Sequence, residues 1–278
     1  MLLNAMEKGE KIKKKDDVVI SYLDSVGYRT PEEAETELSQ RFSHGVLKEY
    51  RDLVTQHMEH PTVGTALRFY DFLASNTTED GTSMAEIEYQ RIYDRGFIGK
   101  IIPVLMGSCF QYRNILDVGC GIGVITNYFA QQSPHAQFTG VDVSEKSLEI
   151  AIKCASERGL DNVVYRVANL MSLQEAFDQG SFDSVLLVDV VDDSTREGNL
   201  DDFMLDEKFE QIAHVSAKNG LVTVKFSPSG KYGYRWEVLV PECMRRHNIE
   251  PSNDQTHFNF KHQNGATLET YVIRGKKK

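Results

Sequence analysis

The chain has 278 residues, of which 41% are hydrophobic and 26% are charged, a composition typical of a globular protein with a sizeable core. Its 31 basic and 41 acidic residues give a formal charge of −10, which argues against general affinity for nucleic acid. No apolar run approaches the roughly 20 residues that cross a bilayer, so we expect no membrane span and no membrane partner.

The start of the chain and its cysteines favour a cytoplasmic location. Residues 1–6 are too short for the apolar core of a signal peptide and lead directly into charged residues. The four cysteines lie far apart without a Cys-x-x-Cys pair, as is typical of reduced thiols. His57 and His60 have no partners at metal-ligand spacing, and we predict no metal site.

The first part of the chain is predicted to be helical after a polar tail. Residues 1–17 are mostly charged or polar over their second half, and we interpret this segment as a flexible tail. From residue 18 to residue 109, apolar side chains recur at helical spacing, as in Val46, Tyr50 and Leu53. Ser83 and Glu86 form a capping box that predicts the start of a further helix.

After residue 110 the pattern changes to strands that alternate with helices, which is typical of an α/β domain with a parallel sheet. The predicted strands are 114–118, 138–143, 163–167, 184–188, 221–226, 256–261 and 268–273, and the main predicted helices are 122–132, 144–159, 203–218 and 236–247. Ser144 is the predicted N-cap of the second of these helices.

A glycine loop follows the first predicted strand. The sequence Asp-Val-Gly-Cys-Gly-Ile-Gly places glycines at 119, 121 and 123, and the second strand ends at Asp142. Such a loop lets a ligand approach the backbone closely, and a carboxylate at the next strand end can accept two ribose hydroxyls. The dinucleotide fingerprint requires a glycine where Val124 stands, which disfavours a nicotinamide cofactor.

This loop and its downstream carboxylate resemble the class I S-adenosylmethionine-dependent methyltransferases over roughly residues 110–278. The resemblance implies an α/β fold with a seven-stranded Rossmann-like sheet that ends in an antiparallel hairpin. It implies that residues 110–278 bind S-adenosylmethionine and release S-adenosylhomocysteine. It also implies that the preceding α-helical extension, residues 18–109, covers the cofactor and shapes a substrate pocket.

The resemblance places the cofactor at the carboxyl ends of the strands. The implied cofactor-binding residues are Asp117, Gly119, Cys120, Gly121, Gly123, Asp142, Val143, Asn169, Leu170 and Asp189. Asp142 would bind the ribose, Val143 would cover the adenine, and Asn169 would accept from the adenine amine. Each polar residue has an alternative. Asp117 could hold the turn, Asp142 could serve the following helix start, and Asn169 is common in loops. We interpret Cys120 as a packing residue.

The predicted catalytic candidates are Asp192 and His257. Asp192 follows the fourth strand and could accept a proton from an acceptor amine or hydroxyl, or could equally cap a following helix. His257 lies in the terminal hairpin, where a surface or core role is the alternative. A base is required only if the attacking atom arrives protonated, because methyl transfer from a sulfonium depends mainly on positioning.

The favoured function is methyl transfer to an O, N or C atom of a small-molecule acceptor. A protein or peptide acceptor is the second reading, since the acidic charge favours a basic substrate. A third alternative is a subunit or sensor that binds the cofactor without catalysing methyl transfer. The alternative from another class of protein is a nicotinamide-dependent oxidoreductase. The sequence leaves open the acceptor and the oligomeric state, because specificity lies in loops and the helical extension.

Overall fold

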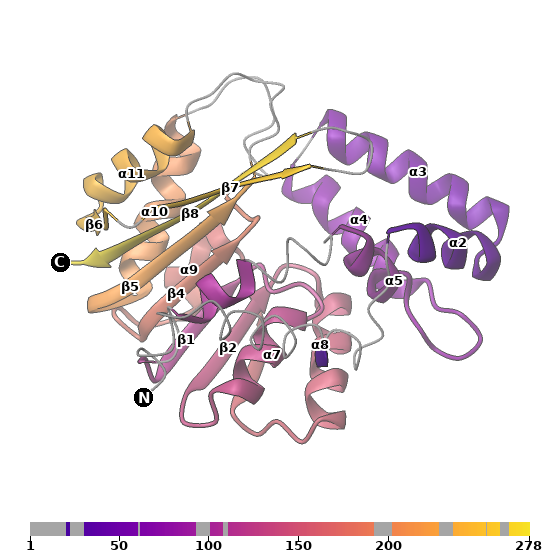
Figure 1. Cartoon of the computed structure of the whole chain (residues 1–278), viewed down its shortest axis with the longest axis horizontal. Helices are drawn as coiled ribbons and strands as arrows, with labels where there is room; N and C mark the ends of the chain where they lie inside the picture. Colours follow the sequence, from indigo (N-terminus) through magenta and orange to yellow (C-terminus); the bar gives the residue numbers. More distant parts are fainter. Residues whose placement is uncertain are drawn as a thin grey trace.

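The computed structural model describes residues 21–22, 31–60, 62–92, 101–107, 111–191, 202–227, 236–253, 255–261 and 267–278. The predicted tail, residues 1–17, lies outside these ranges. The described chain forms a group of N-terminal helices beside an α/β layer structure (Figure 1). We call α2 to α5 the cap; they span Pro31–Arg41, His44–Glu59, Val63–Ser75 and Met84–Ile92.

The cap has its own apolar core and well-defined helix starts. Leu38, Leu53, Leu73 and Ile87 are buried together there, and Ile122 of the glycine loop joins the same cluster. The predicted capping box is confirmed, because Ser83 N–H donates to Glu86 Oε2 at 2.7 Å and Glu86 N–H donates to Ser83 Oγ at 3.2 Å. Such a cap stabilises a helix by about 1 kcal/mol.

The second part of the chain alternates strands with helices. Its strands are β1 (Asn114–Val118), β2 (Gln137–Asp142), β3 (Val163–Val167), β4 (Phe182–Val188), β5 (Ser216–Phe226), β6 (Ile249–Pro251), β7 (Thr256–Lys261) and β8 (Thr267–Lys277). Its helices are α7 (Val124–Gln132), α8 (Glu145–Glu157), η2 (Leu170–Ser172), α9 (Leu173–Ala176), α10 (Asp202–Val215) and α11 (Trp236–Arg246).

The strands form one mixed sheet, as the sequence predicted. Over the described residues the order is β3-β2-β1-β4-β5-β8-β6, with β7 also paired to β8. Strands β1 to β5 run parallel, and β8 is antiparallel to β5 and to β7. The predicted terminal hairpin is therefore present. The described sheet has eight strands rather than seven, because β6 and β7 pair with successive parts of β8.

Several element bounds differ from the sequence prediction, and the difference at α10 has a clear physical reason. Helix α10 ends at Val215 rather than at residue 218, and β5 begins immediately. The last helical carbonyls are bonded there, because Ser216 Oγ donates to Ile212 O at 2.7 Å and Gly180 N–H donates to His214 O at 2.8 Å. The short strand β6 was not predicted, since three residues that end in a proline carry no alternating pattern.

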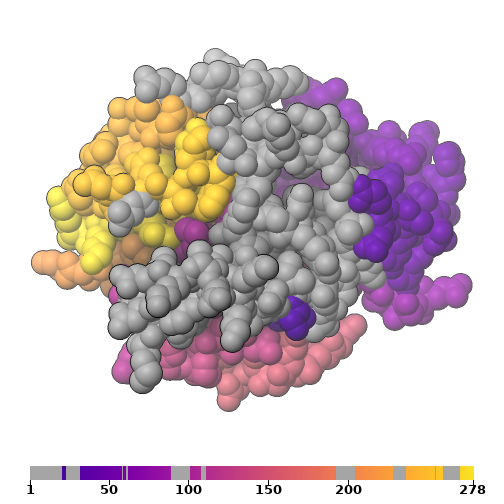
Figure 2. Space-filling model, viewed as in Figure 1, coloured from indigo at the N-terminus to yellow at the C-terminus, as the bar shows by residue number. Residues whose placement is uncertain are grey.

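Apolar clusters cover both faces of the sheet. One face packs against α9, α10 and α11 through residues such as Leu205 and Val240. The other packs against α7 and also buries Tyr22 and the helical segment 101–107 through Ile101 and Leu105. The cap and the C-terminal elements lie at opposite ends of the face in Figure 2. Thus Tyr22 and residues 101–107, expected in the helical extension, pack with the α/β layers.

The strand order creates a crevice at the carboxyl ends of the central strands. The chain passes from β1 outward to β2 and β3, then returns to β4 on the other side of β1. Ligands of open α/β sheets bind at such a reversal, outside the carboxyl ends of the strands. No helix among the described residues is long and apolar enough to span a bilayer.

Candidate functional site

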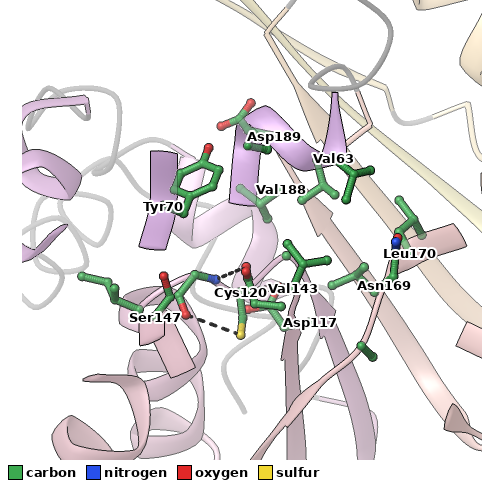
Figure 3. Close-up of a pocket in the computed structure, with 18 of the residues that line it drawn as sticks. Val63, Tyr70, Asp117, Cys120, Val143, Ser147, Asn169, Leu170, Val188 and Asp189 are labelled. Atoms are coloured by element: carbon green, nitrogen blue, oxygen red, sulfur yellow. Dashed lines mark hydrogen bonds between the residues drawn. The ribbon is translucent and has the colours of Figure 1, made fainter. Parts of the chain in front are cut away.

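A cavity of about 240 Å³ lies at the carboxyl ends of β1, β2 and β4. Its floor comes from the glycine loop, the end of β2 and the residues after β3, and its other wall comes from α4 and α5 of the cap (Figure 3). The predicted residues Asp117, Gly119, Cys120, Gly121, Asp142, Val143, Asn169, Leu170 and Asp189 all line it. The fold thus brings together side chains that lie far apart in the sequence.

The three glycines of the loop serve different purposes. All adopt positive φ angles of 71°, 54° and 74° at Gly119, Gly121 and Gly123, where other residues are strained. A Cβ on Gly119 would lie 2.3 Å from Val190, and one on Gly123 would lie 2.6 Å from the Tyr165 hydroxyl. A Cβ on Gly121 would meet nothing within 4 Å. Gly121 therefore leaves open space beside the cavity, while the other two permit close packing.

Asp142 joins the loop to the start of α8. Its Oδ2 accepts from Gly121 N–H and its Oδ1 accepts from Ser144 N–H, both at 2.9 Å. The role at the helix start is thus present in the structure. A carboxylate offers about four lone-pair positions, so a ribose diol can still be accepted. Burial raises the pKa of Asp142, and the backbone bonds oppose that rise.

Asp117 is buried below the loop and accepts from Thr126 Oγ1 at 2.6 Å. This bond ties β1 to α7, so the structural role of Asp117 is present. Burial raises the pKa of Asp117 to about 7, the Thr126 bond opposes the rise, and the Asp142 charge adds to it. Burial also raises the pKa of Cys120, which keeps the thiol protonated and agrees with a packing role.

Asn169 caps the short helix η2. Its side-chain oxygen accepts from Met171 N–H at 2.9 Å. The oxygen expected to meet the adenine amine is therefore already bonded once, although an amide oxygen has a second lone pair. Val143 and Leu170 supply apolar wall on either side of this corner.

The structure separates the remaining candidates. Asp189 lines the cavity and has an unusual positive φ of 54°. Asp192 lies outside the described residues. His257 is exposed on β7, its ring stacks on Tyr271 with centroids 4.4 Å apart, and it is absent from the described lining of the cavity. The geometry gives no support to His257 as a base, and that role stays a sequence prediction.

Several cavity residues were not predicted as functional. Tyr70 and Leu73 lie three residues apart in α4, within the part of the chain predicted to be helical, and the structure places them in the wall. Glu88 of α5 and Lys208 of α10 also line the cavity, each only 2% exposed. The sequence shows charged residues at these two positions but does not reveal that they are buried. Without that information they look like ordinary surface residues.

In the ranges that the structure covers, no three His, Cys, Asp or Glu side chains are grouped so that they could hold an ion. The polar side chains of the lining include carboxylates, one amide and the Lys208 ammonium, which suit hydroxyl, amine and carboxylate groups of an organic ligand.

Comparison with known proteins identifies the domain that carries the cavity. Residues 111–229 match a family described as a methyltransferase domain. An uncharacterised protein of Rickettsia prowazekii is 28% identical over 54% of this chain and 56% of its own length. A ubiquinone biosynthesis O-methyltransferase of Paracidovorax citrulli is 35% identical over 35% of this chain and 37% of its own. The chain thus spans about half or less of the length of these relatives.

A solved structure shows the same fold over most of the chain. The N-methyltransferase NodS of Bradyrhizobium japonicum, in complex with S-adenosyl-L-homocysteine, superposes with a TM-score of 0.54 at 14% identity. The superposition covers 76% of this chain and 97% of NodS. Residues 111–229 thus match a methyltransferase domain in sequence, and the described sheet has the Rossmann-like fold of class I S-adenosylmethionine-dependent methyltransferases.

Proposed function

We propose that the protein binds S-adenosylmethionine in this cavity and transfers its methyl group to a small-molecule acceptor. The observation that carries the proposal is the shape of the loop at Gly121. This glycine leaves open space beside the cavity, and its N–H group fixes an Asp142 carboxylate that lines the same wall. A nucleoside ligand requires both features, room against the backbone and a fixed pair of acceptor oxygens.

The residues present fit the cofactor. Asp142 would hold the ribose hydroxyls, since its two backbone bonds fix the carboxylate plane and leave lone pairs for them. Val143 and Leu170 offer apolar surface for the adenine, and Asn169 offers its amide. The bound sulfonium would supply an activated methyl group, and the chain's own residues would orient it and exclude water.

The cap is the second support for the proposal. Val63, Ala66 and Tyr70 of α4 line the cavity, and Figure 3 shows Val63 and Tyr70 across it from Asp117 and Cys120. An acceptor has to reach the methyl group of the bound cofactor past this wall, which favours a compact molecule or a narrow inserted group. These contacts favour a small molecule over a folded protein. The methylated atom, O, N or C, is left open by the proposal.

Titration calorimetry with S-adenosylmethionine, S-adenosylhomocysteine and NAD tests the cofactor directly. We expect both sulfur ligands to bind the wild type and NAD to give no heat. Asp142→Ala should weaken the binding of both sulfur ligands by about tenfold or more. Each tenfold loss corresponds to about 1.4 kcal/mol of binding free energy. Asp161→Ala, which removes an exposed carboxylate before β3, is the matched control and should bind as the wild type does.

The variant requires a test of folding, because Asp142 also bonds the loop backbone. Thermal unfolding of each ligand-free variant separates a lost ligand contact from a lost loop. Binding of NAD alone, or of none of the three, would contradict the proposal. Binding without product formation across a panel of acceptors would instead favour a cofactor sensor or subunit.

A further inference from the structure

Strand β5 carries a lysine in its buried part. Lys225 lies between Val224 and Phe226, both fully buried, and its own side chain is 1% exposed. Burying an ammonium group in this way strongly destabilises the folded state unless an anion and further acceptors surround the group. The contacts of Lys225 therefore indicate its role.

Lys225 contacts Asp189 at two points. Its ammonium donates to Asp189 Oδ2 and forms an ion pair with that carboxylate. Its backbone carbonyl accepts from the Asp189 N–H at 2.9 Å. The ammonium also donates to Ser227 Oγ at 3.0 Å, and Ser227 shares a hydrogen bond of 2.9 Å with Thr270 of β8. A polar chain thus runs from β8 through β5 to the end of β4.

Within this series of hydrogen-bonded side chains, Asp189 is the residue that lines the cavity. It follows β4 directly, lines the cavity, and keeps 27% of its side chain exposed. Its φ of 54° lies in the left-handed region that residues other than glycine adopt uncommonly. Such a conformation persists where the surroundings enforce it, and here one residue bonds both the backbone and the side chain of Asp189.

We propose that Lys225 is a positioning residue that holds the Asp189 carboxylate at the cavity wall for a hydroxyl or ammonium group of the bound cofactor. This inference rests on the proposed function and adds Lys225, with Ser227 and Thr270 behind it, to the residues on which ligand binding depends. Lys225 itself is absent from the cavity lining within the described residues, so it acts through Asp189.

A double-mutant cycle measured by calorimetry with S-adenosylhomocysteine tests the inference. The variants are Lys225→Met, Asp189→Asn and the two combined. Methionine has a side chain of similar length to lysine but carries no charge. We expect each single variant to lose about tenfold in affinity and the double variant to lose no more than Asp189→Asn alone. A purely structural lysine would weaken binding equally in both backgrounds. Lys218→Met, an exposed lysine of the same strand, is the control and should bind normally.

Ser227→Ala covers the possibility that Lys225→Met does not fold. It removes one acceptor from the ammonium and leaves the ion pair, so a smaller loss of affinity is expected, and again none in the Asp189→Asn background. Wild-type affinity in Lys225→Met, or losses that multiply in the double variant, would overturn the inference alone. If the wild type binds neither S-adenosylhomocysteine nor S-adenosylmethionine, the proposed function fails and this inference fails with it.

Discussion

At the scale of single residues, the glycines of the β1–α7 loop differ in what surrounds them. Gly119 faces Val190 at a distance that forbids a methyl group, whereas Gly121 faces open space. Both have positive φ angles, so backbone strain is common to them. Gly119 is therefore required for close packing against Val190, whereas Gly121 leaves space for a ligand next to the backbone.

Alanine substitutions should separate these two roles. Gly119→Ala combines strain with a steric clash and should lower the free energy of unfolding by about 2–4 kcal/mol. Gly121→Ala should cost only the strain, about 1–2 kcal/mol, yet weaken S-adenosylhomocysteine binding. Gly81→Ala is the control, because Gly81 has φ 82° with nothing within 4 Å of a Cβ and is absent from the described cavity wall. Urea unfolding and calorimetry measure both quantities, and equal affinity for the Gly121 and Gly81 variants would contradict the assignment.

Asp117 gives the fold a pH dependence of defined sign. An unfolded aspartate has a pKa of about 3.9, and burial raises the pKa of folded Asp117 to about 7. Between these values the folded state binds the extra proton, so this group's contribution to stability is complete below about pH 4 and is lost as the pH rises through about 7.

Asp117→Asn should remove that dependence. The amide cannot ionise, and its oxygen can still accept from Thr126, so the variant should lose less stability than the wild type between pH 5 and pH 8. Urea unfolding at several pH values measures the slope. Asp161→Asn, at an exposed position, should keep the wild-type slope. An unchanged slope in Asp117→Asn would mean that other groups cause the dependence.

At the scale of elements, a hydrogen bond ties the cap to the start of α8 beside the cavity. Ser144 Oγ donates to Asp71 Oδ1 of α4 at 2.6 Å and accepts from Ser147 N–H at 3.1 Å, which confirms Ser144 as the N-cap of α8. The backbone of the same residue donates to Asp142. Ser144 therefore links the wall formed by α4 to the carboxylate expected to bind ribose.

Removing this link should loosen α4 before it affects the sheet. Asp71→Ala should cost about 1 kcal/mol or less, and Ser144→Ala should cost about 1 kcal/mol more because α8 loses its cap as well. Hydrogen exchange should rise in α4 in both variants and in the first turn of α8 only in Ser144→Ala. Asp52→Ala, on the exposed face of α3, should change neither. Exchange that rises equally across the sheet would contradict a local link.

At the scale of the whole molecule, cap and sheet should respond to ligand together. Ile122 of the glycine loop is buried in the apolar cluster of the cap, and Ser144 Oγ donates to Asp71 Oδ1 of α4. A ligand at 100 times its Kd stabilises the folded state by about 2.7 kcal/mol. Saturating S-adenosylhomocysteine should therefore raise Tm by several degrees in one cooperative transition. Scanning calorimetry measures this, and Asp142→Ala should abolish most of the shift. Two separate transitions, with only one shifted, would show that the cap unfolds independently.

The sequence by itself determined the features that depend on neighbouring residues. Strand β1 has the predicted bounds, and the capping residues Ser83 and Ser144 act as predicted. The glycine loop and Asp142 were recognisable because a βαβ unit places them by short-range rules. The bounds of α10 were predicted less well, because its last turn is decided by Gly180, a residue of another loop.

Only the tertiary structure decided which distant side chains meet. Lys225 and Asp189 are 36 residues apart, and Asp71 and Ser144 are 73 apart. The sequence shows a lysine within the apolar run of β5, but no periodicity specifies its partner. Local hydrogen bonds and spacing are written into consecutive residues, whereas the meeting of α4, β4 and β5 at one cavity depends on how all the layers pack.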